Sequence, residues 1–247
     1  MSLSKEDIKQ YYSEWWENPK DIRNMVFNKL NDYVKQRIPH GSGKKALDIG
    51  SGHGRIVSYL TEKGYRVAAV EFNEEFVAEL KTNFAGVEVI CEDIRNMDFC
   101  EKFDVVTCIE LVQNLDRDDL PALLAKLSRI TKLLLINLSN GNSLHARWVS
   151  LRGWRNSFVF NYTPKELEQV LNQAGFDIVH RRGIGLITPI SLFNDFKVKL
   201  IPVWLAKVVN KLDALAPKMC HLYYIEATSR ICAEVQHADT GSEDMFS

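Results

Sequence analysis

The stretch Ala46-Leu-Asp-Ile-Gly-Ser-Gly-His-Gly54 decides the fold. It begins in a short apolar segment, Lys45–Ile49, which has the length and composition of a buried strand, and it leads into a helical pattern over Arg55–Lys63. Glycines between a strand and a helix let the backbone turn tightly and let a ligand lie against it, while the N–H groups at the helix start can bind an anion. The sequence therefore predicts a ligand-binding turn here.

Alternating strands and helices continue along the chain from this turn. Strands are expected at Lys45–Ile49, Arg66–Glu71, Glu88–Cys91, Phe103–Ile109, Leu133–Leu138, Asp177–His180 and Leu222–Ala227. Helices are expected at Arg55–Lys63, Glu74–Asn83, Asp118–Ile130 and Thr163–Ala174. This alternation predicts a Rossmann-like α/β fold in which seven strands form a mostly parallel sheet with helices on both faces.

The alternating pattern divides the chain into a core and its additions. The core domain is expected over residues 41–230, after an aromatic-rich helical cap over residues 1–40. Two insertions, 141–161 and 183–221, interrupt the alternation. If the last strand is antiparallel, both leave from the carboxyl edge of the sheet, where ligands bind, and they are expected to cover the substrate site. The polar segment 231–247 has no pattern and is expected to be a disordered tail.

Composition excludes several classes of protein. Hydrophobic residues make up 46% of the chain and the formal net charge is −1, which is typical of a globular domain and gives no reason to expect a nucleic-acid partner. The five cysteines lack C-x-x-C spacing and indicate reduced thiols in a cytoplasmic protein. The N-terminus lacks a signal-peptide core, and no apolar run approaches the roughly 20 residues of a membrane span. Peripheral contact with a membrane and the oligomeric state are left open.

The spacing of the glycines discriminates between ligand classes. Gly50, Gly52 and Gly54 give G-x-G-x-G, whereas Arg55 occupies the third glycine position of the dinucleotide fingerprint G-x-G-x-x-G. No Lys-Ser/Thr pair follows, so the turn is not a P-loop. Glu71, at the end of the second strand, is placed to accept hydrogen bonds from both hydroxyls of a ribose, which serves NAD and S-adenosylmethionine (AdoMet) alike.

Several segments, in this order, resemble the class I AdoMet-dependent methyltransferases of the type 11 small-molecule group. The resembling segments are Ala46–Gly54, Val70–Asn73, Cys91–Ile94, Phe103–Glu110, Tyr162–Leu167 and Ala174–Phe176. The resemblance implies AdoMet as cofactor, S-adenosylhomocysteine (AdoHcy) as product and an antiparallel last strand. It also implies cofactor contacts at Asp48, Gly50, Ser51, Gly52, Glu71, Phe72, Asp93, Ile94, Ile109 and Glu110.

The resemblance implies a specific role for four of these residues, and three of the four have an alternative. Glu71 would bind the ribose, Asp48 would approach the ammonium group, and Asp93 would accept a hydrogen bond from the adenine amino group. Phe72 would pack on the adenine face. The alternatives are a turn-capping role for Asp48, simple core packing for Phe72 and an ordinary loop acid at Asp93.

A distant resemblance to the ubiquinone-biosynthesis O-methyltransferases rests on Trp15-Trp16 and the stretch Asn137–Trp148. It implies that Arg23 binds the cofactor carboxylate, the alternative being a surface charge, and Tyr12 is expected either to cover the cofactor or to pack in the cap. That group carries E-x-x-E-H where this chain has Glu110-Leu-Val-Gln-Asn114. Neutral amides are weak ligands for a hard cation, so no bound metal is expected and a quinone acceptor is less favoured.

The insertions carry the candidate acceptor residues. An arginine cluster for an anionic acceptor, or else a solvated basic face, is expected from His145, Arg147, Trp148, Arg152, Trp154, Arg155, Arg181 and Arg182. His145 is the candidate general base, the alternative being a loop histidine. A lysine-flanked helix over Val198–Leu215 has an apolar stripe that fits either packing on the domain or contact with lipid.

These features together predict a methyltransferase that acts on oxygen or nitrogen of a small molecule, with an anionic or lipid-like acceptor left open. The alternatives are an NAD-dependent oxidoreductase and a non-catalytic methyltransferase-like binding protein. The glycine spacing and the lack of a recognisable Tyr-x-x-x-Lys pair argue against the first. The intact core motifs argue against the second.

Overall fold

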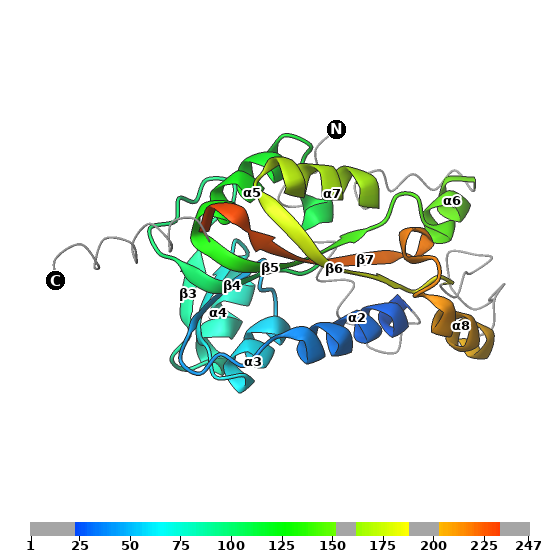
Figure 1. The fold of residues 1–247 in the computed structure, drawn as a ribbon. Coiled ribbons are helices and arrows are strands. Elements are labelled where there is room, and N and C mark those ends of the chain that lie inside the picture. Colours follow the sequence, from blue (N-terminus) through cyan, green and yellow to red (C-terminus); the bar gives the residue numbers. More distant parts are fainter. Residues whose placement is uncertain (1–22, 152–161, 188–202, 233–247) are drawn as a thin grey trace, which may run out of the picture.

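A computed structural model describes residues 23–151, 162–187 and 203–232, except for the side chains of residues 23–25, 148–150, 203, 206 and 207 (Figure 1). Within these ranges seven strands form one sheet, in the order β3-β2-β1-β4-β5-β7-β6. The strands are β1 (Lys45–Ile49), β2 (Arg66–Glu71), β3 (Glu88–Cys91), β4 (Phe103–Cys108), β5 (Thr131–Ser139), β6 (Phe176–Ile184) and β7 (Leu222–Ser229). Strands β1 to β5 pair in parallel, and β7 is antiparallel to both β5 and β6, which confirms the predicted Rossmann-like fold.

Helices cover both faces of the sheet (Figure 1). They are α2 (Arg23–Arg37), α3 (Arg55–Glu62), α4 (Glu74–Asn83), α5 (Asp119–Ile130), α6 (Leu144–Leu151), α7 (Pro164–Gln173) and α8 (Val203–Val209), with 3-10 turns η1 (Val112–Asn114), η2 (Asn210–Leu212) and η3 (Pro217–Met219). Two buried clusters correspond to the two faces. Leu47 and Ile49 of β1 pack with α5 and α7, whereas Ala46 packs with α2 and α3, as expected for a strand that is covered on both sides.

Helix α2 is the described part of the predicted N-terminal cap, and it packs into the core. Leu30, Val34 and Ile38 recur at four-residue spacing and are at most 1% exposed. Arg37 makes a two-pronged ion pair with Glu226 of β7, at 2.5 Å and 2.6 Å. This helix therefore covers one face of the sheet as part of the domain.

The packed chain extends slightly past residue 230, where the tail was expected to begin. The Cys232 side chain is 3% exposed, and its backbone N–H donates to Ser229 Oγ at 3.0 Å. Residues 233–247, which make up the rest of the predicted tail, lie outside the described residues.

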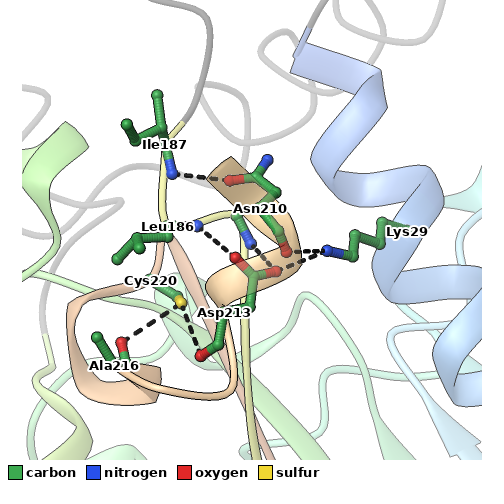
Figure 2. Close-up of polar contacts among 8 residues, drawn as sticks. Lys29, Leu186, Ile187, Asn210, Asp213, Ala216 and Cys220 are labelled. Atoms are coloured by element: carbon green, nitrogen blue, oxygen red, sulfur yellow. Dashed lines mark hydrogen bonds and ion pairs between the residues drawn. The ribbon is translucent and has the colours of Figure 1, made fainter. Parts of the chain in front are cut away.

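A buried polar cluster fixes the second insertion to the domain (Figure 2). Asp213 is fully buried and accepts hydrogen bonds from Lys29 Nζ at 2.7 Å and from two backbone N–H groups of segment 185–187, at 3.0 Å and 2.9 Å. Asn210 accepts from the third N–H of this segment at 2.9 Å, and its carbonyl accepts from Lys29. Helix α2, the end of β6 and η2 are thereby joined around one carboxylate.

This cluster explains a difference from the predicted helix over Val198–Leu215. In the described part the α-helix ends at Val209 and continues only as the 3-10 turn Asn210–Leu212. The side chains of Asn210 and Asp213 are occupied by the backbone of segment 185–187, and such side-chain bonds offer the chain an alternative to a continued helix. Residues 198–202 lie outside the described residues.

We expect Asp213→Ala to lower the free energy of unfolding by about 3 kcal/mol, because Lys29 and two buried N–H groups lose their acceptor. Denaturant unfolding followed by circular dichroism measures the change. Lys211→Ala, at an exposed position of η2, is the control and should stay within about 0.5 kcal/mol of the wild type. A loss below about 1 kcal/mol for Asp213→Ala would contradict the structural role of this carboxylate.

Candidate functional site

A pocket of about 1240 Å³, its open mouth included, lies at the carboxyl ends of β1, β2, β3 and β4. Open α/β sheets bind ligands at this edge. Ten of the predicted cofactor residues line the pocket: Asp48, Gly50, Ser51, Gly52, Glu71, Phe72, Asp93, Ile94, Ile109 and Glu110. Residues as much as 62 positions apart in the sequence thus line one cavity.

The glycine turn needs its glycines for two different reasons. Gly54 has φ 80°, and a Cβ at this position would lie 2.3 Å from the ring of Phe84, so the residue is fixed by packing. Gly52 has φ 49°, and a Cβ there would meet no atom within 4 Å. Because Gly52 also lines the pocket, it leaves the backbone open to close approach by a ligand.

Glu71 joins the turn to the second strand. Its Oε1 accepts from the backbone N–H groups of Phe72 and Asn73, both at 2.9 Å, and its Oε2 accepts from Gly52 N–H at 2.9 Å. The side chain is 5% exposed. A carboxylate has about four acceptor sites, so Oε2 retains capacity for a hydroxyl of a ligand. The position and fixed orientation of Glu71 fit the role predicted for a ribose-binding acid.

Among the described residues, only one of the two buried carboxylate oxygens of Asp48 has a hydrogen-bond partner. Thr107 Oγ1 donates to its Oδ1 at 2.6 Å, whereas among the described residues Oδ2 has no hydrogen-bond partner. Burial raises the pKa of Asp48 to about 6, against the lowering effect of Thr107. A buried acceptor without a partner is costly, so Oδ2 is suited to a donor or cation supplied by a ligand. The ammonium group of AdoMet fits this requirement.

Glu110 has a left-handed backbone, with φ 61°, which is unusual for a residue other than glycine and tends to occur at functional sites. Its N–H donates to Asn137 Oδ1 at 2.7 Å, and Asn137 Nδ2 donates back to its Oε1. Gln113 Nε2 donates to Oε2 at 3.1 Å. Burial raises the pKa of Glu110 to about 7, and Arg55 opposes this rise. The carboxylate is therefore held in place and titrates near neutrality.

Gln113 stands at the second acidic position of the metal-binding pattern found in the distant relatives, and its side-chain amide donates to Glu110 Oε2. In the part of the chain that the structure describes, no group of three or more His, Cys, Asp or Glu side chains could hold a metal ion. The expectation of a metal-free site stays a prediction.

The β3 side of the pocket contains a pair that sequence reasoning missed. Arg95 Nε and Nη2 donate to the two carboxylate oxygens of Asp93, at 3.0 Å and 2.6 Å. Asp93 therefore already has a charged partner, and an adenine amino group would share its remaining acceptor capacity. His53 and Phe76, whose rings lie 4.4 Å apart, also line this pocket without having been predicted.

Two further pocket residues, Arg55 and Asn31, escaped prediction for different reasons. Arg55 directly follows the last glycine of the turn, at the position where the dinucleotide fingerprint has its third glycine. Asn31 belongs to α2, and no local signal indicates that this helix reaches the pocket. Its presence there depends on packing alone.

Three predicted residues are not brought to the pocket by the described structure. Tyr12 lies outside the described residues, and Arg23 is the first residue of α2 with a side chain that is not described. His145, on α6, is not among the residues that line the pocket. Its ring lies 4.7 Å from that of His221, and burial lowers its pKa to about 4. His145 is thus neutral at pH 7, and its role as a base stays a prediction.

The predicted arginine cluster is wrong in one respect. Arg181 and Arg182 are successive residues of β6, so their side chains point to opposite faces of the sheet. Arg181 Nε lies 3.4 Å from Glu168 of α7, whereas the Arg182 guanidinium lies over the ring of Tyr33 in α2. The two arginines therefore cannot join one anion site. Arg152, Trp154 and Arg155 lie outside the described residues, as does the side chain of Trp148.

The apolar stripe of the second insertion is exposed in its described part. Trp204 is 67% exposed, Val208 53% and Leu215 80%. The choice between packing on the domain and contact with lipid stays a prediction. No described helix is long and apolar enough to cross a bilayer.

Comparisons with known proteins agree with this geometry. Residues 46–133 match a family described as a methyltransferase domain. The chain is 27% identical over 161 residues to a ubiquinone biosynthesis O-methyltransferase of Rhodopseudomonas palustris, covering 58% of this chain and 62% of that protein. It is 29% identical over 108 residues to the protein of the same name from Pseudomonas entomophila, covering 40% and 46%. The chain thus spans less than two thirds of the length of these relatives.

Among solved structures, the fold resembles magnesium protoporphyrin IX methyltransferase from Synechocystis PCC 6803 with bound SAH. The TM-score is 0.64, the sequence identity is 14%, and the match covers 92% of this chain and all of that one. At this level of identity the similarity supports the fold alone.

The raised pKa of Glu110 predicts a pH-dependent stability. The folded state retains a proton that the unfolded chain, with a carboxyl pKa of about 4.3, releases earlier. The free energy of unfolding should therefore fall as pH rises from about 5 through about 7, by on the order of 2 kcal/mol from this group. Glu110→Gln should lose less stability than the wild type between about pH 5 and pH 8. Denaturant unfolding at several pH values measures this difference, and equal slopes would contradict the titration of Glu110.

Proposed function

Because the chain belongs to the class I AdoMet-dependent methyltransferases, we propose that it transfers the methyl group of AdoMet to an oxygen or nitrogen of a small-molecule acceptor, leaving AdoHcy. One observation carries this proposal. The ten residues that the resemblance assigns to the cofactor line a single pocket, in which a buried oxygen of Asp48 has no hydrogen-bond partner among the described residues.

The residues of the pocket would bind and orient the cofactor. Glu71, fixed by three backbone N–H groups, would accept the ribose hydroxyls, and Asp48 Oδ2 would accept from the ammonium group. Phe72 and Ile94 would contact the adenine. AdoMet supplies an electrophilic methyl group on a sulfonium, so alignment and exclusion of water are the main tasks left to the protein.

For the methyl acceptor we propose only a substrate class and a neighbouring pair of histidines. His145 and His221 lie together beside the carboxyl edge of β5, and the Phe27 ring of α2 lies 6.0 Å from that of His221. His145 is neutral at pH 7 and would accept a hydrogen bond from a hydroxyl or ammonium acceptor, although burial, which lowers its pKa to about 4, makes it a weak base. An anionic or lipid-like acceptor remains our proposal for the substrate class, and a screen with labelled AdoMet tests it.

The exposed stripe supports peripheral contact with anionic lipid. Apolar side chains are exposed on α8 and beyond it, and Lys211 is exposed beside them. A stripe of this composition with lysines near it is suited to the surface of a negatively charged bilayer.

We further propose a cytoplasmic location, since all five cysteines are free, as is usual in a reducing compartment.

We expect Glu71→Gln to weaken binding of both AdoMet and AdoHcy by on the order of 10-fold or more, because a charged acceptor for the ribose is lost. Isothermal titration calorimetry measures both dissociation constants. Glu75→Gln, at an exposed position of α4, should leave them unchanged.

Titration with NADH in the same instrument tests the oxidoreductase alternative. Tight NADH binding by a wild-type protein that does not bind AdoMet would refute the proposed function. A protein that binds AdoMet and methylates no acceptor in a broad screen would favour the non-catalytic alternative.

We expect the wild type to sediment with vesicles that contain phosphatidylglycerol and not with vesicles of phosphatidylcholine alone. Replacing Trp204 and Leu215 together by serine should reduce this binding by about 10-fold, since two exposed apolar anchors are removed. Val179→Ser, at a 56% exposed apolar position of β6, is the matched control. Equal binding of the double variant and the wild type would contradict lipid contact through this stripe.

A further inference from the structure

Three charged side chains gather at the β1–β4 side of the pocket. Asp48 belongs to β1 and lies in register with Thr107 of β4, and Glu110 follows the end of β4. Arg55 begins α3, and its guanidinium and the Glu110 carboxylate attract each other. All three residues line the pocket, so this side presents two carboxylates and one guanidinium cation.

Glu71, Asp93 and Arg95 lie on the β2–β3 side of the pocket. Glu71 accepts three backbone N–H groups at the end of β2. Arg95 is held by Asp93 through two hydrogen bonds after the end of β3. These positions match the ribose and the adenine under the proposed function, which leaves the β1–β4 side for the methionine part of the cofactor.

The methionine part of AdoMet carries two cationic groups, the ammonium and the sulfonium, and one carboxylate. The two carboxylates of Asp48 and Glu110 match the two cationic groups in number, and the Arg55 guanidinium matches the carboxylate. On the basis of the proposed function, we infer that the Arg55 guanidinium binds the carboxylate of the cofactor, while Asp48 and Glu110 face its two cationic groups.

The chemistry of Arg55 fits this role. A guanidinium offers donors in a planar fork that matches both oxygens of a carboxylate. Burial lowers the pKa of Arg55, which means that its charge has lost part of its hydration and gains from an added anion. The two oxygens of Glu110 accept from the amides of Asn137 and Gln113, so this carboxylate is held in position independently of Arg55.

The role of binding the cofactor carboxylate passes from Arg23 to Arg55 in this inference. The resemblance assigned the carboxylate to Arg23, whose side chain is not described. The placement of Arg55 instead follows from the pocket itself, where it lines the same cavity as Asp48 and Glu110. The two assignments can be separated by experiment.

The test compares AdoMet with decarboxylated AdoMet, which keeps the sulfonium and the amine and lacks only the carboxylate. Isothermal titration calorimetry on the full chain gives the ratio of the two dissociation constants. The wild type should prefer AdoMet by on the order of 10- to 100-fold. In Arg55→Met this preference should fall below about 3-fold through weaker binding of AdoMet, with decarboxylated AdoMet bound as well as before. Arg55→Lys, which keeps the charge and loses the fork, should give an intermediate preference.

Two control variants and a folding check complete the design. Arg95→Met removes the other arginine among the described residues that line the pocket and should leave the preference at the wild-type value. Arg23→Met tests the competing assignment. Thermal unfolding confirms that each variant is folded, and if Arg55→Met unfolds, Arg55→Lys carries the comparison with an expected drop of several-fold.

The inference is overturned if the wild type binds the two ligands equally, or if the Arg55 variants keep the full preference for AdoMet. Loss of the preference in Arg23→Met alone would transfer the role to Arg23. A wild type that binds neither ligand would refute the proposed function together with the inference. A wild type that binds AdoMet, with the preference intact in the Arg55 variants, would refute the inference alone.

Discussion

The carboxylate of Glu71 joins the two strands on which the pocket depends. It accepts the N–H of Gly52 from the turn after β1 and the N–H groups of Phe72 and Asn73 at the end of β2. Since the bonded N–H groups come from both sides of the crevice, one nearly buried acid sets the shape of the glycine turn and its distance from the neighbouring strand. A site preorganised in this way needs little rearrangement when a ligand enters, which lowers the entropic cost of binding.

Around this fixed acid, the other acids of the pocket differ in how the protein holds them. On the β2–β3 side, Glu71 and Asp93 have their partners within the protein. On the β1–β4 side, Asp48 keeps a buried oxygen without a partner among the described residues, and Glu110 is held in a strained backbone conformation. Burial raises the pKa of both of these acids, so the protein has placed them where an approaching cation is favoured. A sulfonium cofactor with an ammonium group meets this condition.

The end of β6 is fixed by contacts between segments that lie far apart in the chain. Lys29 of α2 and Asp213 of the second insertion are 184 residues apart and form an ion pair of 2.7 Å that also fixes the end of β6 (Figure 2). The same helix contributes Asn31 to the pocket. The described part of the insertion that follows α8 is thereby fixed to the end of β6, and the apolar side chains Trp204, Val208 and Leu215 are exposed.

The sequence by itself determined the alternation of strands and helices, the glycine turn and the acids at the strand ends. These features depend on local periodicity and on fixed spacing from the turn. The sequence pattern ends the sixth strand at His180, whereas β6 continues to Ile184, and this longer strand places Arg181 and Arg182 on opposite faces of the sheet. Only the tertiary structure decided that α2 lines the pocket, that Arg55 faces Glu110 and that His145 packs against His221. These contacts join segments with no common local pattern, and they are fixed by packing and burial of the whole chain, which no single window of sequence contains.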